Sequence, residues 1–299
     1  MAEPGTARRV VVGVDDSPEA ARARDFAARE ARSRAARLDI VRAVELPLLS
    51  PYAATIPYDD VAGAAQTWVD GVVEETRRRF PDVEVSGEAL TGSGPTVLLD
   101  RSADADLLVV GSRSRSAAKT ILLGSVSSAV AAHAECPVIV VRGATASRDG
   151  GGGRGHRVVV GADGSQIGHA AVEFAFEEAA RWDLPLEVVY AWELEPFGVA
   201  GLWEADLSVE EGQRYSEDQV ETEIAPLRTR YPRVEVRVIA VQGKPASVLA
   251  ERAAGTALLV VGSRGRGGIT GLLLGSVSQS VLHHADCPVA VVHRRTEDA

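Results

Sequence analysis

The chain has 299 residues, 45% of them hydrophobic and 25% charged, so we expect a globular protein of two domains, each with its own core. Its formal net charge of -10 argues against nucleic acid or an anionic membrane surface as partner, because both are polyanions, although a small phosphate ligand needs only local positive charge. Because no stretch has the roughly 18–20 apolar residues of a membrane span, and neither a signal-peptide core nor a disulfide framework is visible, we expect a cytoplasmic protein without a membrane span.

In the first half, short apolar segments alternate with amphipathic ones. The pattern predicts strands at residues 10–14, 38–44, 83–90, 107–110 and 138–141, and helices at 18–34, 61–80, 96–102 and 125–133. Strands made almost wholly of Val, Leu and Ile indicate a sheet that is buried on both faces and therefore mostly parallel. We expect a doubly wound α/β domain, in which ligands bind beyond the carboxyl ends of the strands. Longer loops at Leu46–Asp60 and Glu193–Asp206 would either cover this edge or contact a partner.

The second half of the chain repeats the first. Three segments recur, with residues 9–17 matching 157–165, residues 107–113 matching 258–264, and residues 133–141 matching 284–292. The segment between the two copies is rich in glycine, which predicts a flexible linker. We therefore predict two domains, at residues 1–145 and 156–299, that are joined by a linker at 146–155.

Asp15 and Asp163 each follow the first strand of their half, at the edge where a glycine-rich loop also begins. A carboxylate there can accept hydrogen bonds from ribose hydroxyls or from an adenine amine. The alternative is that each aspartate caps the following helix, but Ser17 and Ser165 are already placed for that task. We favour the ligand interpretation, because both halves have the aspartate while the next residue differs.

A glycine-rich loop with the spacing Gly262-x2-Gly265-x9-Gly275-Ser276 connects a buried strand to a helix. Unpaired amides at a helix N-terminus and the helix dipole favour an anion, and glycines allow the backbone to approach it closely. The loop lacks the Gly-Lys-Ser/Thr of a Walker A motif and the Gly-x-Gly-x-x-Gly of a dinucleotide fingerprint. We predict a phosphate-binding loop; the alternative is a loop that only turns the chain.

With these residues assembled, the chain resembles the universal stress protein family in its tandem, two-domain form. The resemblance covers nearly the whole chain and rests on the Val-Gly-x-Asp-x-Ser opening, the spaced glycine loop and the Cys-Pro-Val-x-Val-Val last strand. It implies two flavodoxin-like α/β domains, each a five-stranded, mostly parallel sheet with helices on both faces. In one of the two branches of the family it also implies binding of ATP, either alone or with Mg²⁺.

By position, the resemblance assigns two groups of residues to an ATP site in each half. The nucleoside end would take Gly161, Asp163 and Ala191 in the second half, and Gly13, Asp15 and Ala43 in the first. The phosphate loop would take Val261, Gly262, Arg264, Gly265, Gly275, Ser276 and Val277 in the second half, and Val110, Gly111, Arg113, Ser114, Gly124, Ser125 and Val126 in the first.

The first half departs from the pattern at Ser114, which stands where the second glycine of the loop should be. Serine offers the same backbone N–H only if φ is negative there or the strain is tolerated. We therefore expect both halves to bind ATP and the second half to bind it more tightly. Arg113 and Arg264 would add positive charge near the phosphates; the alternative is that they are solvated loop residues.

Neither a catalytic set nor a metal site is predicted. No nucleophile with a base and an orienting group is visible, so any hydrolysis of ATP should be slow. His283, His284 and Cys287 lie close in sequence, but adjacent residues on a helix point about 100° apart rather than converging on one ion.

The sequence therefore predicts an ATP-binding regulator of stress response or growth, whose nucleotide-dependent conformation is read by an unknown protein partner. Two alternatives remain at this point: a slow ATP hydrolase or phosphate-transfer enzyme, and a nucleotide-free interaction scaffold. The resemblance also suggests that the halves pack as an intramolecular pseudo-dimer through their last strands, Val138–Val141 and Val289–Val292. A homodimer of the whole chain is a further option.

Overall fold

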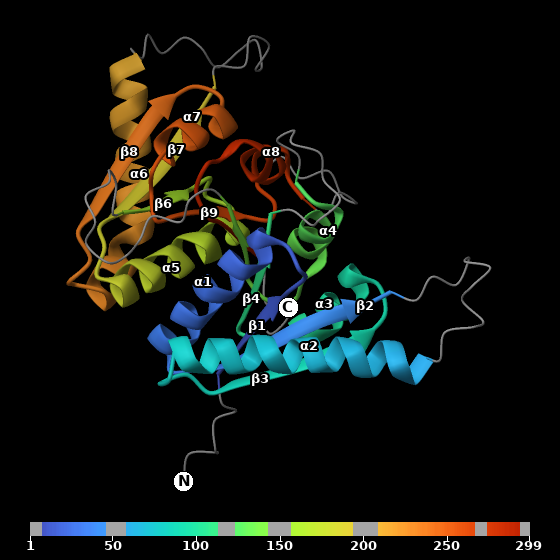
Figure 1. The fold of residues 1–299 in the computed structure, drawn as a ribbon. Helices are drawn as coiled ribbons and strands as arrows, with labels where there is room; N and C mark the ends of the chain where they lie inside the picture. Colours follow the sequence, from blue (N-terminus) through green and yellow to red (C-terminus); the bar gives the residue numbers. More distant parts are fainter. Residues whose placement is uncertain are drawn as a thin grey trace. The chain divides into compact units, whose positions relative to one another are not determined.

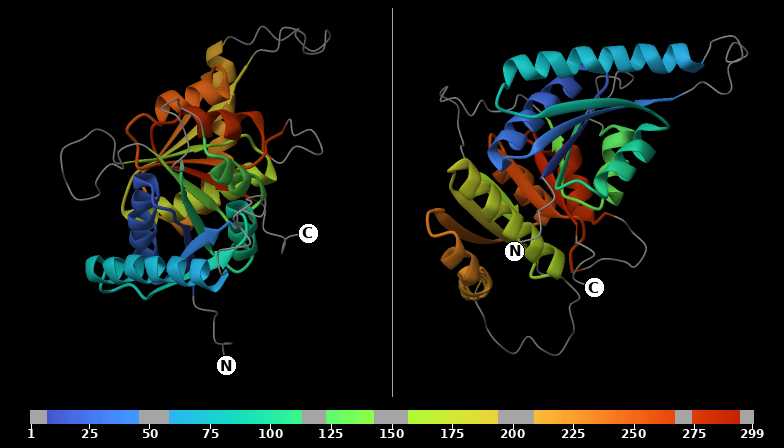
Figure 2. Two further views of the ribbon diagram at one scale, coloured as in Figure 1. Left: turned by 45° about the vertical axis from the view of Figure 1, so that its right-hand side comes forward. Right: turned by 90° about the horizontal axis from the view of Figure 1, so that it is seen from below.

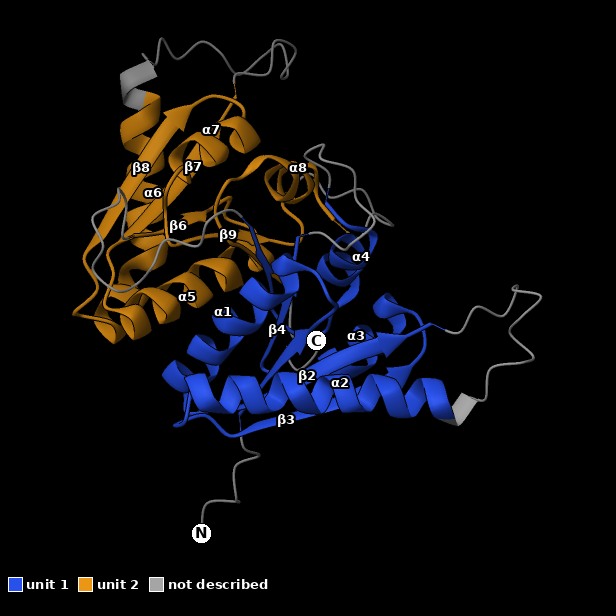
Figure 3. Ribbon diagram, in the orientation of Figure 1, with its two compact units in different colours: residues 1–142, 295–299 blue, residues 143–294 orange. Residues whose placement is uncertain are grey.

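The computed structural model of the protein describes residues 8–45, 58–112, 123–142, 157–193, 209–266 and 274–293. The chain divides into two compact units, residues 1–142 with 295–299 and residues 143–294 (Figure 3). The predicted linker at 146–155 lies outside the described residues. Within the described parts of the chain, no helix has both the length and the apolar character needed to cross a membrane.

In the first unit, strands and helices alternate along the chain (Figure 1). The elements are β1 (Arg9–Gly13), α1 (Pro18–Arg34), β2 (Arg37–Val44), α2 (Tyr58–Arg79), β3 (Val85–Thr91), α3 (Gly94–Ser102), β4 (Leu107–Gly111), α4 (Ser125–His133) and β5 (Val138–Val141). The strands pair in parallel in the order β3-β2-β1-β4-β5. The strand order reverses between β1 and β4, where ligands of doubly wound sheets bind.

The second unit repeats this plan. Its elements are β6 (Val158–Gly161), α5 (Gln166–Trp182), β7 (Leu186–Trp192), α6 (Val209–Arg230), β8 (Val236–Gln242), α7 (Pro245–Arg252), β9 (Leu258–Gly262), α8 (Ser276–His284) and β10 (Val289–Val292). The strands pair in parallel in the order β8-β7-β6-β9-β10, so that β6 and β9 flank the reversal. The predicted fold, two flavodoxin-like α/β domains with five-stranded parallel sheets, is confirmed.

Both faces of each sheet are covered by helices (Figure 2). In the first unit α1 and α2 pack against each other, as α3 and α4 do, and each pair also contacts strands of the sheet. The central strands are therefore buried along their length, with Val10–Val12 and Leu107–Val109 fully excluded from solvent. This explains why their sequences are continuous apolar runs without alternation.

Several element boundaries differ from the predicted ones for local reasons. Helix α2 begins at Tyr58 rather than Val61, so the predicted loop Leu46–Asp60 is shorter than expected, and the rest of it lies outside the described residues. Helix α3 begins at Gly94 because the Ser93 hydroxyl caps it, accepting from the amide of Thr96 at 3.3 Å. Strand β3 begins at Val85 because Val83 still belongs to the preceding turn.

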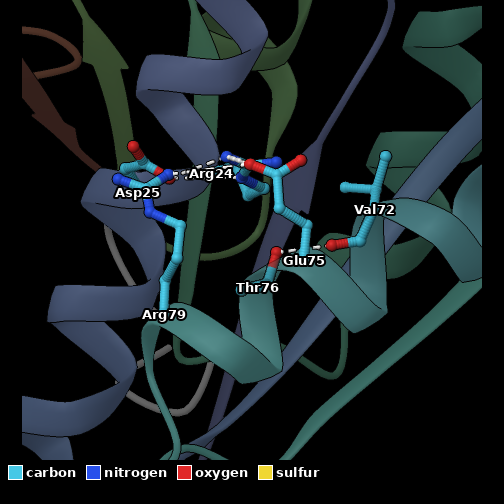
Figure 4. A network of polar contacts seen from close by, with 6 residues as sticks. All are labelled: Arg24, Asp25, Val72, Glu75, Thr76 and Arg79. Atoms are coloured by element: carbon cyan, nitrogen blue, oxygen red, sulfur yellow. Dashed lines mark hydrogen bonds and ion pairs between the residues drawn. The ribbon is translucent and has the colours of Figure 1, made fainter.

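A polar network joins α1 to α2 (Figure 4). The buried guanidinium of Arg24 donates to Asp25 at 3.0 Å and to Glu75 at 2.9 Å, and Arg79 donates to Asp25 at 2.6 Å. Burial alone would lower the pKa of Arg24, but the hydrogen bonds to Glu75 and Asp25, with their charges, raise it overall. Arg24 therefore stays charged, and the network fixes α2 on the same side of the sheet as α1.

Candidate functional site

A cavity of about 350 Å³ opens at the carboxyl ends of β6, β7 and β9 in the second unit. Every residue that the resemblance assigned to a site in this half lines it, namely Gly161, Asp163, Ala191, Val261, Gly262, Arg264, Gly265, Gly275, Ser276 and Val277. The volume falls within the range of about 300–1,000 Å³ that is typical of small-molecule sites. The repeated sequence motifs thus meet in one place.

One end of this cavity is the first turn of α8. Its N-cap, Gly275, has no side chain to bond to the turn, and the hydroxyl of Ser278 instead donates to the carbonyl of Ser263 at 3.0 Å. Among the described residues no side chain accepts from this turn, so the amides of Ser276 and Val277 can donate to an external acceptor at the positive end of the helix dipole. A Cβ on Gly275 would come no nearer than 3.5 Å to any atom. Packing does not require glycine there, and the residue leaves open space beside these amides.

The other end of the cavity holds Asp163, which leaves β6 in the turn before α5. Its Oδ1 accepts from the amide of Ser165 at 2.9 Å and from the Ser165 hydroxyl at 2.7 Å, and this hydroxyl in turn caps α5 by accepting from Gly168. Its Oδ2 accepts from the amide of Arg266 at 3.0 Å. As predicted, the serine is the cap; the aspartate orients that serine with one oxygen and faces the glycine loop with the other.

The first unit has the equivalent cavity, of about 320 Å³. It is lined by eight of the assigned residues, namely Gly13, Asp15, Ala43, Val110, Gly111, Gly124, Ser125 and Val126. The two others, Arg113 and Ser114, lie outside the described residues, so the effect of Ser114 stays a prediction. Asp15 binds Ser17 through Oδ1 as Asp163 binds Ser165, but no described residue hydrogen-bonds to its Oδ2.

The sequence interpretation missed a leucine in each cavity wall. Leu98 of α3 lies against Gly13, where a Cβ would come within 2.6 Å of Leu98 Cδ1, and Leu249 of α7 lies against Gly161 in the same way. The signal was present, because both leucines occupy matching positions of the repeat. Glu45 also lines the first cavity, with Oε1 3.4 Å from the amide of Gly94, although nothing in the sequence singled it out.

The described walls of the two cavities differ in charge. In the second unit Arg264 and Arg266 accompany Asp163, whereas in the first unit the charged residues are Asp15 and Glu45. Neither described wall contains a histidine, cysteine or lysine, the usual bases and nucleophiles. The arrangement is suited to binding a ligand with hydroxyls at one end and an anion at the other.

The histidines His169 and His284 do not line the second cavity. His169 lies 3.4 Å from Glu223 of α6, and the ring of His284 bonds to the carbonyl of Ser280 at 2.8 Å. Cys136 and Cys287 are buried. Within the described ranges, no three residues of metal-binding type come together.

Comparison with known proteins gives a consistent picture. The model of the Universal stress protein family matches residues 6–142 and again residues 155–293. The protein named Universal stress protein Rv2005c from Mycobacterium tuberculosis is 34% identical over 306 residues, which cover 98% of this chain and 100% of the relative. A universal stress protein from Mycolicibacterium smegmatis is 33% identical over 307 residues, covering 99% of this chain and 100% of the relative. The crystal structure of a universal stress protein from Archaeoglobus fulgidus has a TM-score of 0.66 and 21% identity, with 97% of each chain covered.

Proposed function

The chain belongs to the universal stress protein family in its tandem form, and from this premise we propose that it binds ATP in the two cavities and acts as a nucleotide-dependent regulator of stress response or growth. The observation that carries the proposal is the second cavity, which joins Asp163 at one end to the uncapped first turn of α8 at the other. A nucleotide has the same two-ended chemistry, with ribose hydroxyls and phosphates.

At the nucleoside end, the carboxylate of Asp163 accepts hydrogen bonds from the ribose hydroxyls. Val189, Ala191 and Leu249 supply an apolar wall against which a base can pack. Gly161 allows Leu249 to lie close to the strand end, because a Cβ there would come within 2.8 Å of the leucine side chain. The first cavity offers the same elements through Asp15, Val41, Ala43 and Leu98.

At the phosphate end, the amides of Ser276 and Val277 donate to phosphate oxygens, and Arg264 and Arg266 supply positive charge. The space beside Gly275 lets the phosphates approach the backbone. Whether Mg²⁺ accompanies them is a separate matter for experiment, since Asp163 is the one carboxylate in the described wall of this cavity.

A binding role suits the cavities better than a catalytic one. A fast ATP hydrolase needs a positioned group to activate water. The carboxylates of the described walls are the aspartates, each already hydrogen-bonded to a serine, and Glu45, which lies near the amide of Gly94 in the first cavity. ATP would therefore act by favouring one conformation of the site, which an unidentified protein partner reads.

Calorimetric titration of the full chain with ATP tests the proposal, together with mass spectrometry of any ligand released from freshly purified protein. Asp163→Asn should weaken binding at the second site by roughly tenfold or more, because a hydrogen bond to a charged acceptor is lost. Asp183→Asn is the matched control, since Asp183 lies in the turn after α5 with φ of 53°, a conformation that asparagine also accepts.

The absence of both binding heat and released nucleotide would contradict the proposal and favour the scaffold alternative. Steady release of phosphate that a single side-chain substitution abolishes would favour the enzyme. Weakening by Asp163→Asn but not by Asp183→Asn supports nucleotide binding in the second cavity.

A further inference from the structure

Arg266, in the wall of the second cavity, contacts residues of three neighbouring segments. Its backbone amide donates to Oδ2 of Asp163 at 3.0 Å, and its Nη1 donates to the hydroxyl of Tyr190 on β7 at 3.4 Å. Its guanidinium also lies directly against Gly164, in the turn between β6 and α5. Since Ser165 already occupies Oδ1, both oxygens of Asp163 have protein partners.

Three glycines are needed for this arrangement. A Cβ on Gly168 would overlap Oδ1 of Asp163, and a Cβ on Gly265 would overlap its Oδ2. A Cβ on Gly164 would overlap Nη2 of Arg266, and this glycine also has a φ of +70°. Because the overlaps at Gly168 and Gly265 involve only side-chain atoms of Asp163, alanine at either position would displace this carboxylate, whereas a side chain at Gly164 would also strain the backbone.

The first half has a side chain at all three corresponding positions, which are occupied by Asp16, Ala20 and Ser114. Asp16 instead accepts from Arg42 of β2 at 2.9 Å, and the Arg42 guanidinium lies 4.0 Å from the ring centre of Trp68. Arg42 occupies the position that corresponds to Tyr190. The repeat therefore uses the same backbone plan for two different sets of contacts beside the aspartate.

We infer that the hydrogen bond from the Arg266 amide to Asp163 forms a latch, which a ligand must open before it can bind Asp163 in the second site. A nucleoside must replace the Arg266 amide on Oδ2 of Asp163 before its ribose can bind there. The counterpart of Arg266 in the first half, Arg115, lies outside the described residues. The inference rests on the proposed function, because it takes Asp163 to be the ribose acceptor.

The Asp163–Arg266 latch links the two ends of the site. Ribose that takes over Oδ2 frees the Arg266 segment of the glycine loop, whose positive charge then becomes available to the phosphates. A nucleoside without phosphates breaks the latch and gains nothing from the released arginine. The latch should therefore make the second site discriminate ATP from adenosine more strongly than a variant in which the latch is broken.

Hydrogen exchange of the Arg266 amide, followed by NMR on the full chain without nucleotide, tests the latch directly. Gly168→Ala copies the first half and forces the Asp163 carboxylate to turn, so the amide should exchange about two- to tenfold faster than in the wild type. Gly71→Ala is the matched control, because it makes the same change in helix α2 at a position where a Cβ meets nothing within 4 Å.

Stopped-flow association of ATP, followed by tryptophan fluorescence, tests whether the ligand must displace the Arg266 amide from Asp163. Gly168→Ala should speed association at the second site about two- to tenfold, since one hydrogen bond no longer has to be broken. Tyr190→Phe removes the guanidinium partner without touching Asp163, and a smaller increase is expected. Gly71→Ala should match the wild type.

An Arg266 amide that exchanges equally fast in the wild type and in Gly168→Ala overturns the latch, as does an unchanged association rate in both latch variants. If the Arg266 amide is protected but the protein binds no ATP at all, the nucleotide function is refuted, and so is the displacement of this amide by ribose. A protected amide together with faster binding in Gly168→Ala supports the inference.

Discussion

Gly111 and Gly275 belong to the same predicted type of loop, yet glycine is required at the two positions for different reasons. A Cβ on Gly111 would lie 3.0 Å from the Glu19 carbonyl carbon and 3.1 Å from its oxygen, so this glycine lets the end of β4 pack against α1. Gly275 meets nothing closer than 3.5 Å. One glycine therefore serves packing, and the other leaves space for a ligand.

Alanine substitutions should separate these two reasons. Gly111→Ala should lower the free energy of unfolding by about 1–3 kcal/mol, because backbone atoms of a packed helix must shift. Gly275→Ala should lower it by less than about 1 kcal/mol, the usual range for a change at an N-cap without a side-chain bond, while weakening ATP binding. Urea unfolding without nucleotide measures the first effect and calorimetry the second; equal losses of stability in the two variants would contradict this distinction.

Sequence reasoning put both aspartates at the ends of the first strands but could not assign their oxygens. Position in the repeat put Asp15 and Asp163 at the cavity edge, because the end of a buried strand is a local feature. The orientation of each carboxylate depends on residues brought close by folding, above all Gly168 and the amide of Arg266. Contacts of this kind carry no periodicity, so only the structure reveals them.

Strands and helices were predictable because their signals are local. Continuous apolar runs gave the central strands, and the Ser17–Pro18 pair gave the start of α1, where the Ser17 hydroxyl accepts from the amide of Ala20 at 3.1 Å. The start of α3 was placed too late, because the capping role of Ser93 was not recognised. The order of the strands in the sheet depends on pairing between residues far apart in sequence. The parallel connections reduce the number of possible strand orders but do not select one of them.

The network between α1 and α2 should contribute measurably to the stability of the first unit. Arg24→Ala removes hydrogen bonds to Asp25 and Glu75 and the packing of a side chain that is only 7% exposed. We expect the free energy of unfolding to fall by about 1–3 kcal/mol.

Arg22→Ala is the control within the same helix. The Arg22 side chain is 42% exposed and, within the described part of the chain, pairs with Glu19 alone, one turn away, so the loss should stay within about 0.5 kcal/mol. Urea unfolding measures the free energy of unfolding of both variants. Equal losses would show that the Arg24 network stabilises the protein no more than an exposed ion pair does.

The two halves also raise the question of how their outer strands are protected. β5 ends the strand order of the first unit and β10 that of the second, and both are wholly apolar. An apolar edge that is left exposed invites association, so pairing of the halves through these strands stays a prediction from the sequence. A chain of residues 1–145 alone should then self-associate into a dimer in sedimentation experiments, and a strictly monomeric half would argue against the pairing.

The repeat predicts two ATP sites in each chain, and the differences between the halves predict that the sites are unequal. The second site has Gly265, Arg264 and Arg266, whereas the first has Ser114 in the loop and Glu45 in the described wall. We expect the second site to bind ATP more tightly, because its loop and its charge both favour phosphate.

Calorimetry on single-site variants separates the two sites. Gly275→Ala should remove the tighter binding step and leave the weaker one, and Gly124→Ala should do the reverse. The two variants are matched, since each adds one methyl group at the N-cap of the helix that follows the loop. If the two variants lose the same amount of ATP binding and the remaining sites have identical affinities for ATP, the two sites are equivalent and the predicted asymmetry is wrong.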